Sequence, residues 1–204
     1  MERVGNVKRW TLNTGRFIST CLCLMVYACG NDYAPKPRGY FKIDLPEKAY
    51  QAYSGECPFE FDYPVYSKVV PDSMGGSKAC SPNLLFPKFN GRIHLSYYEV
   101  ANRERLNELV EDAYKLAYKH VAKSTGIDRQ EINYPSKNVY GALYHIEGNT
   151  ASSVQFYLTD SSRHYIRGAL YFREEPRLDS IQPVLDFVKK DIDVMIRSFR
   201  WKAN

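Results

Sequence analysis

The sequence contains no apolar run long enough to cross a membrane. Its uncharged stretch Phe17–Ala28 (FISTCLCLMVYA) has twelve residues, whereas a membrane-spanning helix needs about 20. Four basic residues precede this stretch: Arg3, Lys8, Arg9 and Arg16. A basic region followed by a short apolar region is typical of a secretory signal peptide. We therefore expect residues 1–28 to be a leader that is removed during export.

The signatures of the common catalytic sites are also missing. The chain has no G-x-S-x-G, Walker loop, dinucleotide-binding glycine pattern or H-E-x-x-H. The four histidines are His94, His120, His145 and His164. No two of them have a spacing that would bring them together on one helix turn or one strand face. We therefore expect no metal and no cofactor. A missing signature does not by itself exclude an enzyme.

One catalytic arrangement is conceivable near the C-terminal half of the chain. A hairpin would bring Ser152 or Ser153 close to Asp160 and His164, which are the residue types of a hydrolase triad. Such a triad depends on geometry in space, however, and short polar side chains in turns usually bond to the backbone. We expect these residues to stabilise turns.

Positive charge is not concentrated in one region. The net charge of the 204-residue chain is +5. The leader holds four basic residues and Glu2, a net +3, so the remainder carries 5 − 3 = +2. A nucleic-acid-binding protein usually has a basic stripe, but here Lys and Arg alternate with Asp and Glu. We therefore expect no nucleic-acid partner.

The length of the chain suits a single domain. We expect this domain to span residues 47–204, after a leader and a spacer.

A cysteine follows the leader directly. Val26-Tyr27-Ala28-Cys29-Gly30 resembles the lipobox cut by lipoprotein signal peptidase, with an aliphatic residue three positions before the cysteine and a small residue beside it. We expect Cys29 to carry the lipid. The alternatives are an uncleaved leader, or lipid on Cys21 or Cys23, which would leave an apolar region too short for a signal. Because Gly30 is not Asp, we favour the periplasmic leaflet of the outer membrane over the inner membrane.

A proline-containing spacer follows the cysteine. Residues 31–46 (NDYAPKPRGYFKIDLP) include three prolines, which favour an extended chain. Basic and aromatic side chains gather on it, namely Lys36, Arg38, Tyr40 and Phe41. Such a strip can dock a partner, or it can pack on its own domain, and the sequence leaves both open.

Only two cysteines, Cys57 and Cys80, come after Cys29. An even pair in an exported chain predicts a disulfide. The alternative is two buried free thiols. Because there is no C-x-x-C, we do not expect a redox-active site.

Hydrophobic patterning predicts an α+β fold. Alternation predicts strands at residues 59–63, 84–86, 92–98, 139–146, 153–158 and 164–172. Apolar residues at helical spacing predict helices at 102–121 and from Asp179 or Ser180 to Phe199, with Pro183 in the first turn of the second. We expect an antiparallel sheet of about five to seven strands covered by the two helices. The order of elements is similar to the PsbP/Mog1-like fold.

Several long segments resemble the gliding motility lipoprotein GldD family of the Bacteroidetes. They are residues 35–46 (PKPRGYFKIDLP), 84–98 (LLFPKFNGRIHLSYY), 112–120 (DAYKLAYKH), 148–172 (GNTASSVQFYLTDSSRHYIRGALYF) and 198–201 (SFRW). The resemblance implies a lipoprotein associated with type IX secretion, whose partners are the membrane and other gliding or secretion proteins of the envelope. It implies no catalytic residues. The only residues to which it assigns a role are the lipid-bearing Cys29 and the pair Cys57 and Cys80.

One Asp-Ser sequence predicts a covalent modification. That phylum glycosylates exported proteins at Asp-Ser before an aliphatic-type residue, so Ser73 in Asp72-Ser73-Met74 is a candidate O-glycosylation site, favoured over Ser180. The alternative to a non-enzymatic component is an envelope hydrolase or a glycan-binding lipoprotein, which would need a concave pocket with converging polar groups.

Overall fold

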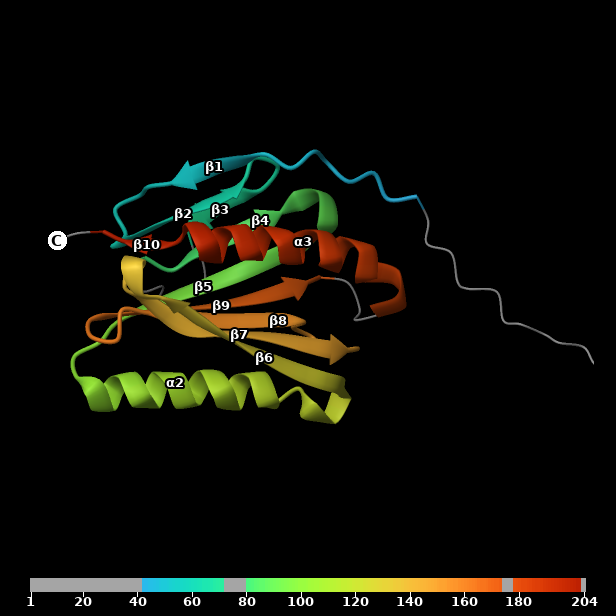
Figure 1. Ribbon diagram of the computed structural model, residues 1–204. Helices are drawn as coiled ribbons and strands as arrows, with labels where there is room; N and C mark the ends of the chain where they lie inside the picture. The colour runs from blue at the N-terminus through green and yellow to red at the C-terminus, as the bar shows by residue number, and fades with distance from the viewer. Residues whose placement is uncertain (1–41, 72–79, 174–177, 203–204) are drawn as a thin grey trace, which may run out of the picture. The chain divides into compact units, whose positions relative to one another are not determined.

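A seven-stranded antiparallel sheet forms the centre of the fold (Figure 1). The computed structural model describes residues 42–71, 80–173 and 178–202, which all belong to one compact unit, Tyr40–Asn204. In this sheet the strand order is β3-β4-β5-β9-β8-β7-β6. The strands are β3 (Lys68–Pro71), β4 (Pro82–Phe86), β5 (Gly91–Glu99), β6 (Ser124–Tyr134), β7 (Val139–Gly148), β8 (Val154–Thr159) and β9 (His164–Phe172).

Strand β8 shows that this sheet is covered on both faces. All six of its residues are buried. Because successive side chains of a strand point to opposite faces, Phe156 and Leu158 join one core while Tyr157 joins another. The sheet therefore forms the middle of three layers.

One face packs against helix α3 (Leu178–Ser198) and a second, smaller sheet. That sheet has the order β1-β2-β10, formed by β1 (Tyr50–Tyr53), β2 (Phe59–Pro64) and β10 (Arg200–Trp201). The apolar stripe of α3 is buried at Leu185, Val188, Ile192, Met195 and Ile196. These side chains share a core with Phe59 and Phe61 of β2 and with the upper face of the large sheet.

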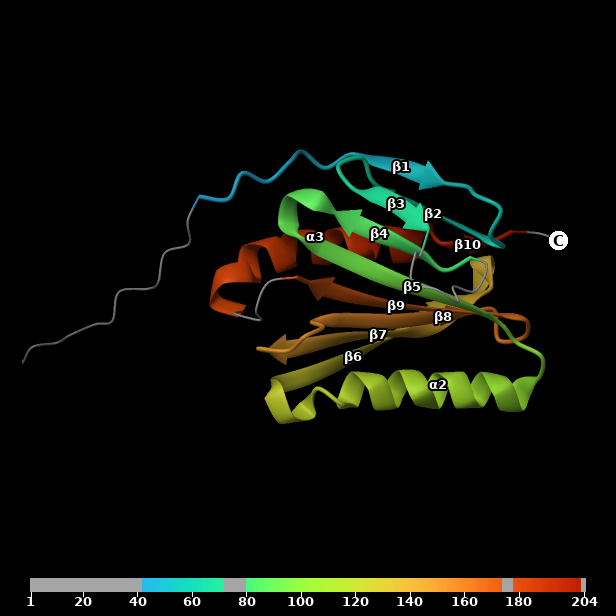
Figure 2. The ribbon, with the colours of Figure 1, turned by 180° about the vertical axis from the view of Figure 1, so that it is seen from behind.

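The opposite face packs against helix α2 (Arg103–Tyr118), as both views show (Figures 1 and 2). The helix starts at an N-cap, Asn102, whose side chain accepts a hydrogen bond from the Arg105 amide at 2.8 Å. Four residues of α2 are buried at helical spacing: Leu106, Leu109, Ala113 and Ala117. They contact Tyr144, Tyr157 and Tyr165 of the sheet. Each helix therefore covers a different face.

The predicted α+β class, with an antiparallel sheet between two helices, is confirmed. Three differences are clear. First, the small sheet was not expected. Second, the eleven-residue strand β6 was not predicted. Third, α3 begins at Leu178, so Asp179 and Ser180 lie in its first turn instead of capping it, and Pro183 lies further inside the helix. Short 3-10 turns connect several elements: η1 (Pro87–Phe89), η2 (Val121–Lys123) and η3 (Pro135–Lys137).

Neither α2 nor α3 could serve as a membrane-spanning helix. Across residues 42–71, 80–173 and 178–202, no helix combines the length and the apolar character that a span requires.

Candidate functional site

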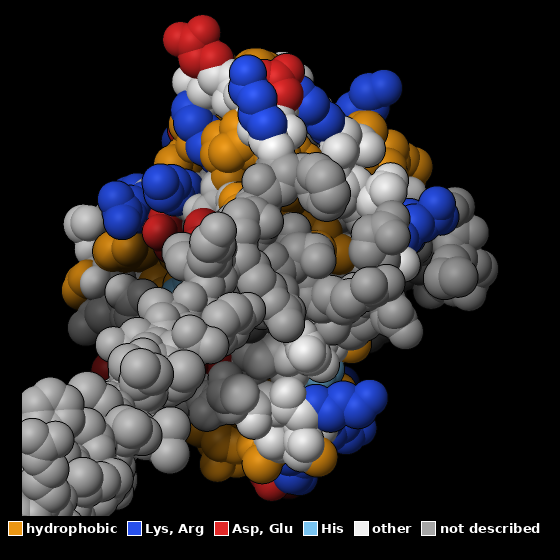
Figure 3. All heavy atoms as spheres, turned by 90° about the vertical axis from the view of Figure 1, so that its right-hand side faces the viewer, with side chains coloured by type: hydrophobic (Ala, Val, Ile, Leu, Met, Phe, Trp, Pro, Cys, Tyr) orange, Lys and Arg blue, Asp and Glu red, His pale blue; other side chains and the backbone are white. Residues whose placement is uncertain are grey.

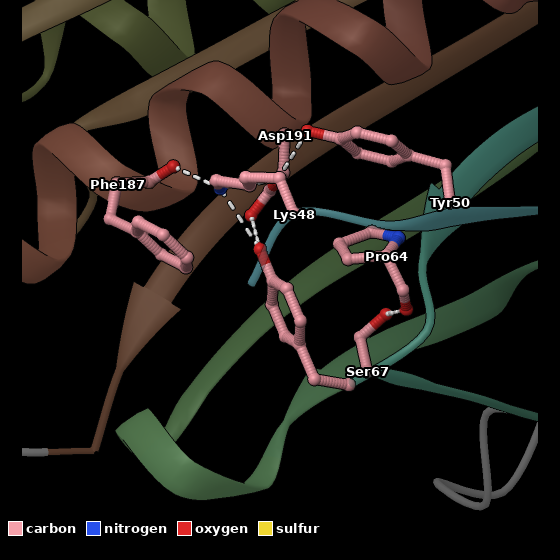
Figure 4. Close-up of polar contacts among 7 residues, drawn as sticks. Lys48, Tyr50, Pro64, Ser67, Phe187 and Asp191 are labelled. Atoms are coloured by element: carbon pink, nitrogen blue, oxygen red, sulfur yellow. Dashed lines mark hydrogen bonds and ion pairs between the residues drawn. The ribbon is translucent and has the colours of Figure 1, made fainter. Parts of the chain in front are cut away.

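A buried carboxylate on α3 is the centre of a side-chain network that joins distant parts of the described chain (Figure 4). Asp191 has a side chain that is only 1% exposed. It accepts hydrogen bonds from the Tyr50 hydroxyl at 3.0 Å and from the Tyr66 hydroxyl at 2.5 Å. Lys48 completes the set, with its Nζ 2.5 Å from Asp191 Oδ1. Three donors from the N-terminal part of the domain thus converge on one carboxylate of the last helix.

Lys48 is held by more than its ion pair. Its Nζ also donates to the Tyr66 hydroxyl and to the Phe187 carbonyl, both at 2.9 Å. The same ammonium lies 3.3 Å from the centroid of the Phe187 ring, a cation–π contact that gains strength where water is excluded. We name Lys48, Tyr50, Tyr66, Phe187 and Asp191 the Asp191 cluster.

Hydrogen bonds to Asp191 favour the protonated form of each ionisable donor of this cluster. Burial raises the pKa of Tyr50 to about 12, and the hydrogen bond to Asp191 acts in the same direction. The pKa of Tyr66 is raised above its usual value for the same two reasons. Burial lowers the pKa of Lys48, but the hydrogen bond and charge of Asp191 oppose that shift. The carboxylate 2.5 Å from the ammonium therefore favours its charged form against the effect of burial.

The cluster fastens the segment that leads into the domain. No side chain of residues 42–47 is buried, and Asp44 makes only an exposed ion pair with Lys88 at 3.5 Å. Strand β1 has no buried residue either and pairs only with β2. Lys48 is therefore the first described residue that is bonded to a buried group.

The hypothetical triad does not form. The Asp160 carboxylate accepts hydrogen bonds from the backbone amides of Ser162, Arg163 and His164 and from the Ser162 hydroxyl. Burial acts to raise the pKa of Asp160, but these bonds outweigh it and hold the pKa below its usual value. Asp160 is thus a turn residue, as expected.

The other members of that triad point elsewhere. The His164 ring nitrogen Nδ1 lies 2.7 Å from the Tyr97 hydroxyl, and the ring stacks on Trp201. The Ser152 hydroxyl donates to the Val154 carbonyl, and Ser152 and Ser153 are only 1% and 4% exposed. Neither Ser152 nor Ser153 is therefore accessible as a nucleophile.

Cys57 and Cys80 are brought together as two free thiols. The Cys80 side chain is hydrogen-bonded to Cys57, and burial, followed by that bond, raises the pKa of Cys80 to about 12. The Tyr53 hydroxyl donates to Cys57 Sγ at 3.3 Å. The disulfide therefore stays a prediction, with its two partners already in contact.

Comparison with known proteins identifies the family. Residues 30–201 match the sequence profile of gliding motility lipoprotein GldD. The chain belongs to the gliding motility lipoprotein GldD family. A search among curated proteins gives no match. Among solved structures, the chain is similar to the solution structure of cyanobacterial PsbP from Synechocystis sp. PCC 6803, with a TM-score of 0.48, 15% identity, and coverage of 79% of this chain and 97% of that one.

Membership of the GldD family places the protein among gliding motility lipoproteins of the cell envelope. The residues that the sequence analysis assigned to the anchor and its surroundings lie outside the described part of the chain. They are Cys29, Lys36, Arg38, Tyr40, Phe41 and Ser73. Their roles remain predictions.

This GldD family member also has an open hollow of about 360 Å³ where β4, η1, β5 and β9 meet. Its basic and aromatic lining includes Arg92, His94, Tyr171 and Arg173. The Arg173 amide donates to the Asn90 carbonyl at 3.0 Å and closes one side. None of the described residues that line the hollow is Asp or Glu, so no carboxylate is available there for acid–base catalysis.

Figure 3 shows the end of the molecule at which α3 begins and β9 ends. On this face, Lys and Arg side chains form separate groups with hydrophobic side chains exposed between them, and Asp and Glu are fewer.

In the part of the chain that is described, no group of three His, Cys, Asp or Glu side chains could hold a metal ion.

Sequence reasoning missed the Asp191 cluster, although one signal was present. Asp191 lies three residues after Val188 and four before Met195, so it occupies the apolar face of α3. A carboxylate on such a face needs a buried partner. The identity of that partner, 143 residues earlier in the sequence, could not be read from spacing.

Proposed function

We propose that this protein is a lipid-anchored, non-enzymatic component of the gliding motility and type IX secretion apparatus. In this proposal Cys29 carries the lipid, the domain faces the periplasm from the outer membrane, and its partners are other envelope proteins. One observation carries the proposal: the family match covers residues 30–201 and so begins directly after the lipobox cysteine.

The domain supports a binding role more than a catalytic one. Its candidate catalytic groups are engaged in turns and packing, as Asp160 and His164 show. The most buried carboxylate, Asp191, is used to hold the entering chain. An anchored interaction module needs such a fixed junction between its spacer and its folded part.

The proposal is tested by replacing Cys29 in a gliding host. We expect the chromosomal Cys29→Ala variant to lose lipid, membrane retention, colony spreading and type IX secretion. Cys21→Ala is the matched control, because it removes a leader cysteine and should leave all four properties intact. A Cys29→Ala strain that spreads and secretes normally would overturn the anchored role.

The spacer side chains Lys36, Arg38, Tyr40 and Phe41 are the proposed contact with the partner. A photo-crosslinking amino acid at position 40 in native membranes should capture one envelope protein of defined mass. The same amino acid at position 163, an exposed residue of the β8–β9 turn, serves as the control. Equal capture from both positions would argue against the spacer.

The hollow favours glycan binding as a second candidate function. Aromatic and basic side chains beside an open cavity suit an acidic sugar. Titration with soluble acidic muropeptides should release measurable heat, which Arg92→Gln abolishes and Arg163→Gln preserves. Absence of binding by the unaltered protein would remove this candidate.

A further inference from the structure

The Asp191 cluster holds the chain at the point where tension on the anchor would enter the domain. A pull on the anchor would be transmitted along residues 42–47, none of which has a buried side chain. Figure 1 shows this part of the chain leading into β1 at the edge of the small sheet. Whatever the direction of the pull, Lys48 and Tyr50 are the first residues bonded to a buried group.

Behind the cluster the attachment is weak for several residues. The four residues of β1 contribute a ladder to β2 but no buried side chain. The backbone adds one further hydrogen bond, from the Val65 amide to the Ala49 carbonyl at 3.0 Å. The next firmly held position is Tyr53, whose ring stacks on Phe61 with centroids 5.0 Å apart and whose hydroxyl donates to Cys57 Sγ. Beyond it, the Ser54 hydroxyl donates to Glu60 and Lys202 donates to the Gly55 carbonyl.

We propose that the Asp191 cluster is a force-releasable fastening that sets the working length of the tether, and that its opening frees residues 48–52 without unfolding the core. The proposal rests on the anchored function proposed above. At about 3.3–3.6 Å per extended residue, the freed segment lengthens the tether by up to about 18 Å.

The physical basis is the difference between the two attachments. Breaking a buried ion pair leaves an uncompensated charge in the interior and has a large energetic cost. Lys48 and Tyr50 both donate to one carboxylate that is 1% exposed, so a pull on this segment has to break both bonds, while Tyr66 stays bonded to Asp191. By contrast, a short exposed strand such as β1 has little to resist peeling once the cluster opens. The release is therefore a single event with a defined length.

Tyr53 marks the end of the segment that can be released. Its ring packs on Phe59 and Phe61 of β2, and its hydroxyl donates to Cys57, which contacts Cys80 from the β3–β4 connection. Phe59 beyond it packs against Phe199 at the end of α3, with ring centroids 5.8 Å apart. Extension past this point requires the core to open.

Single-molecule force spectroscopy on the full chain tests the proposal, with handles at the N-terminus and at exposed position 163. We expect an early extension of up to about 18 Å, separate from domain unfolding and occurring before it. Asp191→Asn should shorten the lifetime of the fastened state at constant force by about a hundredfold. Tyr50→Phe, which removes one hydrogen bond and keeps the ring, should shorten it several-fold.

Lys88→Met is the matched control, because it breaks only the exposed pair with Asp44, and it should change nothing. The proposal is overturned if no early step exists, if both cluster variants leave it unchanged, or if release always coincides with domain unfolding. The measurement does not depend on lipid at Cys29. Its failure is therefore distinct from the failure of the anchored function, which the Cys29→Ala strain reports.

Discussion

The imidazole of His164 stacks on the indole of Trp201, with ring centroids 5.2 Å apart and an angle of 21° between the planes. His164 begins β9, and Trp201 lies in the last strand of the small sheet. Trp201 also meets Phe199 edge to face at 4.8 Å. The contact therefore joins the large sheet to the C-terminal strand.

Trp201 should contribute substantially to stability. We expect Trp201→Ala to lower the free energy of unfolding by about 2–3 kcal/mol, because the ring is half-buried and has three aromatic neighbours. Trp201→Phe should cost less, since it retains edge-to-face packing. Urea denaturation measures both. If the Ala variant is as stable as the unaltered protein, the stack is unimportant.

Mild acid should destabilise the domain through His145. Burial, followed by the charge of Lys189, lowers the pKa of His145, while Asp193, Asp128 and Glu147 oppose this. A base with a folded pKa below its unfolded value binds fewer protons when folded. Its contribution to stability is therefore complete above about 6.5 and is lost as pH falls toward the folded pKa.

Thermal denaturation between about pH 8 and pH 5 tests this expectation for His145. The unaltered protein should lose stability across the interval, and His145→Gln should lose less. His120, whose pKa burial and Arg167 lower, should account for part of the remaining slope. A His145→Gln variant with the same slope as the unaltered protein would show that another group is responsible.

Cys57 and Cys80 should form a disulfide in the exported protein, visible as a loss of two mass units under non-reducing conditions. Because the raised pKa of Cys80 suppresses the reactive thiolate, we expect the folded reduced protein to oxidise slowly and the bond to form mainly during folding. Cys80→Ser should then lower stability by about 3 kcal/mol under oxidising conditions. Two free thiols in the native protein would contradict the prediction.

Gly168 is required because the ring of Phe156 lies over it. A Cβ added at Gly168 would come within 2.1 Å of the Phe156 ring, so Gly168→Ala should destabilise the domain by about 2 kcal/mol or more. At Gly126 the nearest atom to an added Cβ is a Glu147 carboxylate oxygen at 3.3 Å, which can move away. Gly126→Ala should therefore be nearly neutral. Similar melting temperatures for the two variants would contradict this explanation.

The central strands that the sequence predicted carry apolar residues that pack against α2 or α3. These strands are β5, β7, β8 and β9. Burial alternates along most of β5, whereas all six residues of β8 are buried. β6 lies at an edge, and Ile132 is its one buried residue. Its polar exposed positions resemble a loop in sequence, and only pairing with β7 along ten register positions makes it a strand.

The candidate site was less accessible to prediction than the fold. Lys48 and Tyr66 look like ordinary surface or turn residues in the sequence, and only the position of Asp191 on the apolar face of α3 gave a signal. Their proximity depends on how α3 crosses the small sheet, which no local spacing encodes. The predicted turn role of Asp160 was correct because it depends only on residues 160–164.

Strand β9 is inserted between β5 and β8, although both precede it in the chain. During synthesis, a nascent polypeptide that ends before residue 164 would carry two open edges at the centre of its future sheet. Open edges recruit other strands and promote aggregation. Chaperones that bind the nascent chain would therefore be needed most before β9 has been synthesised.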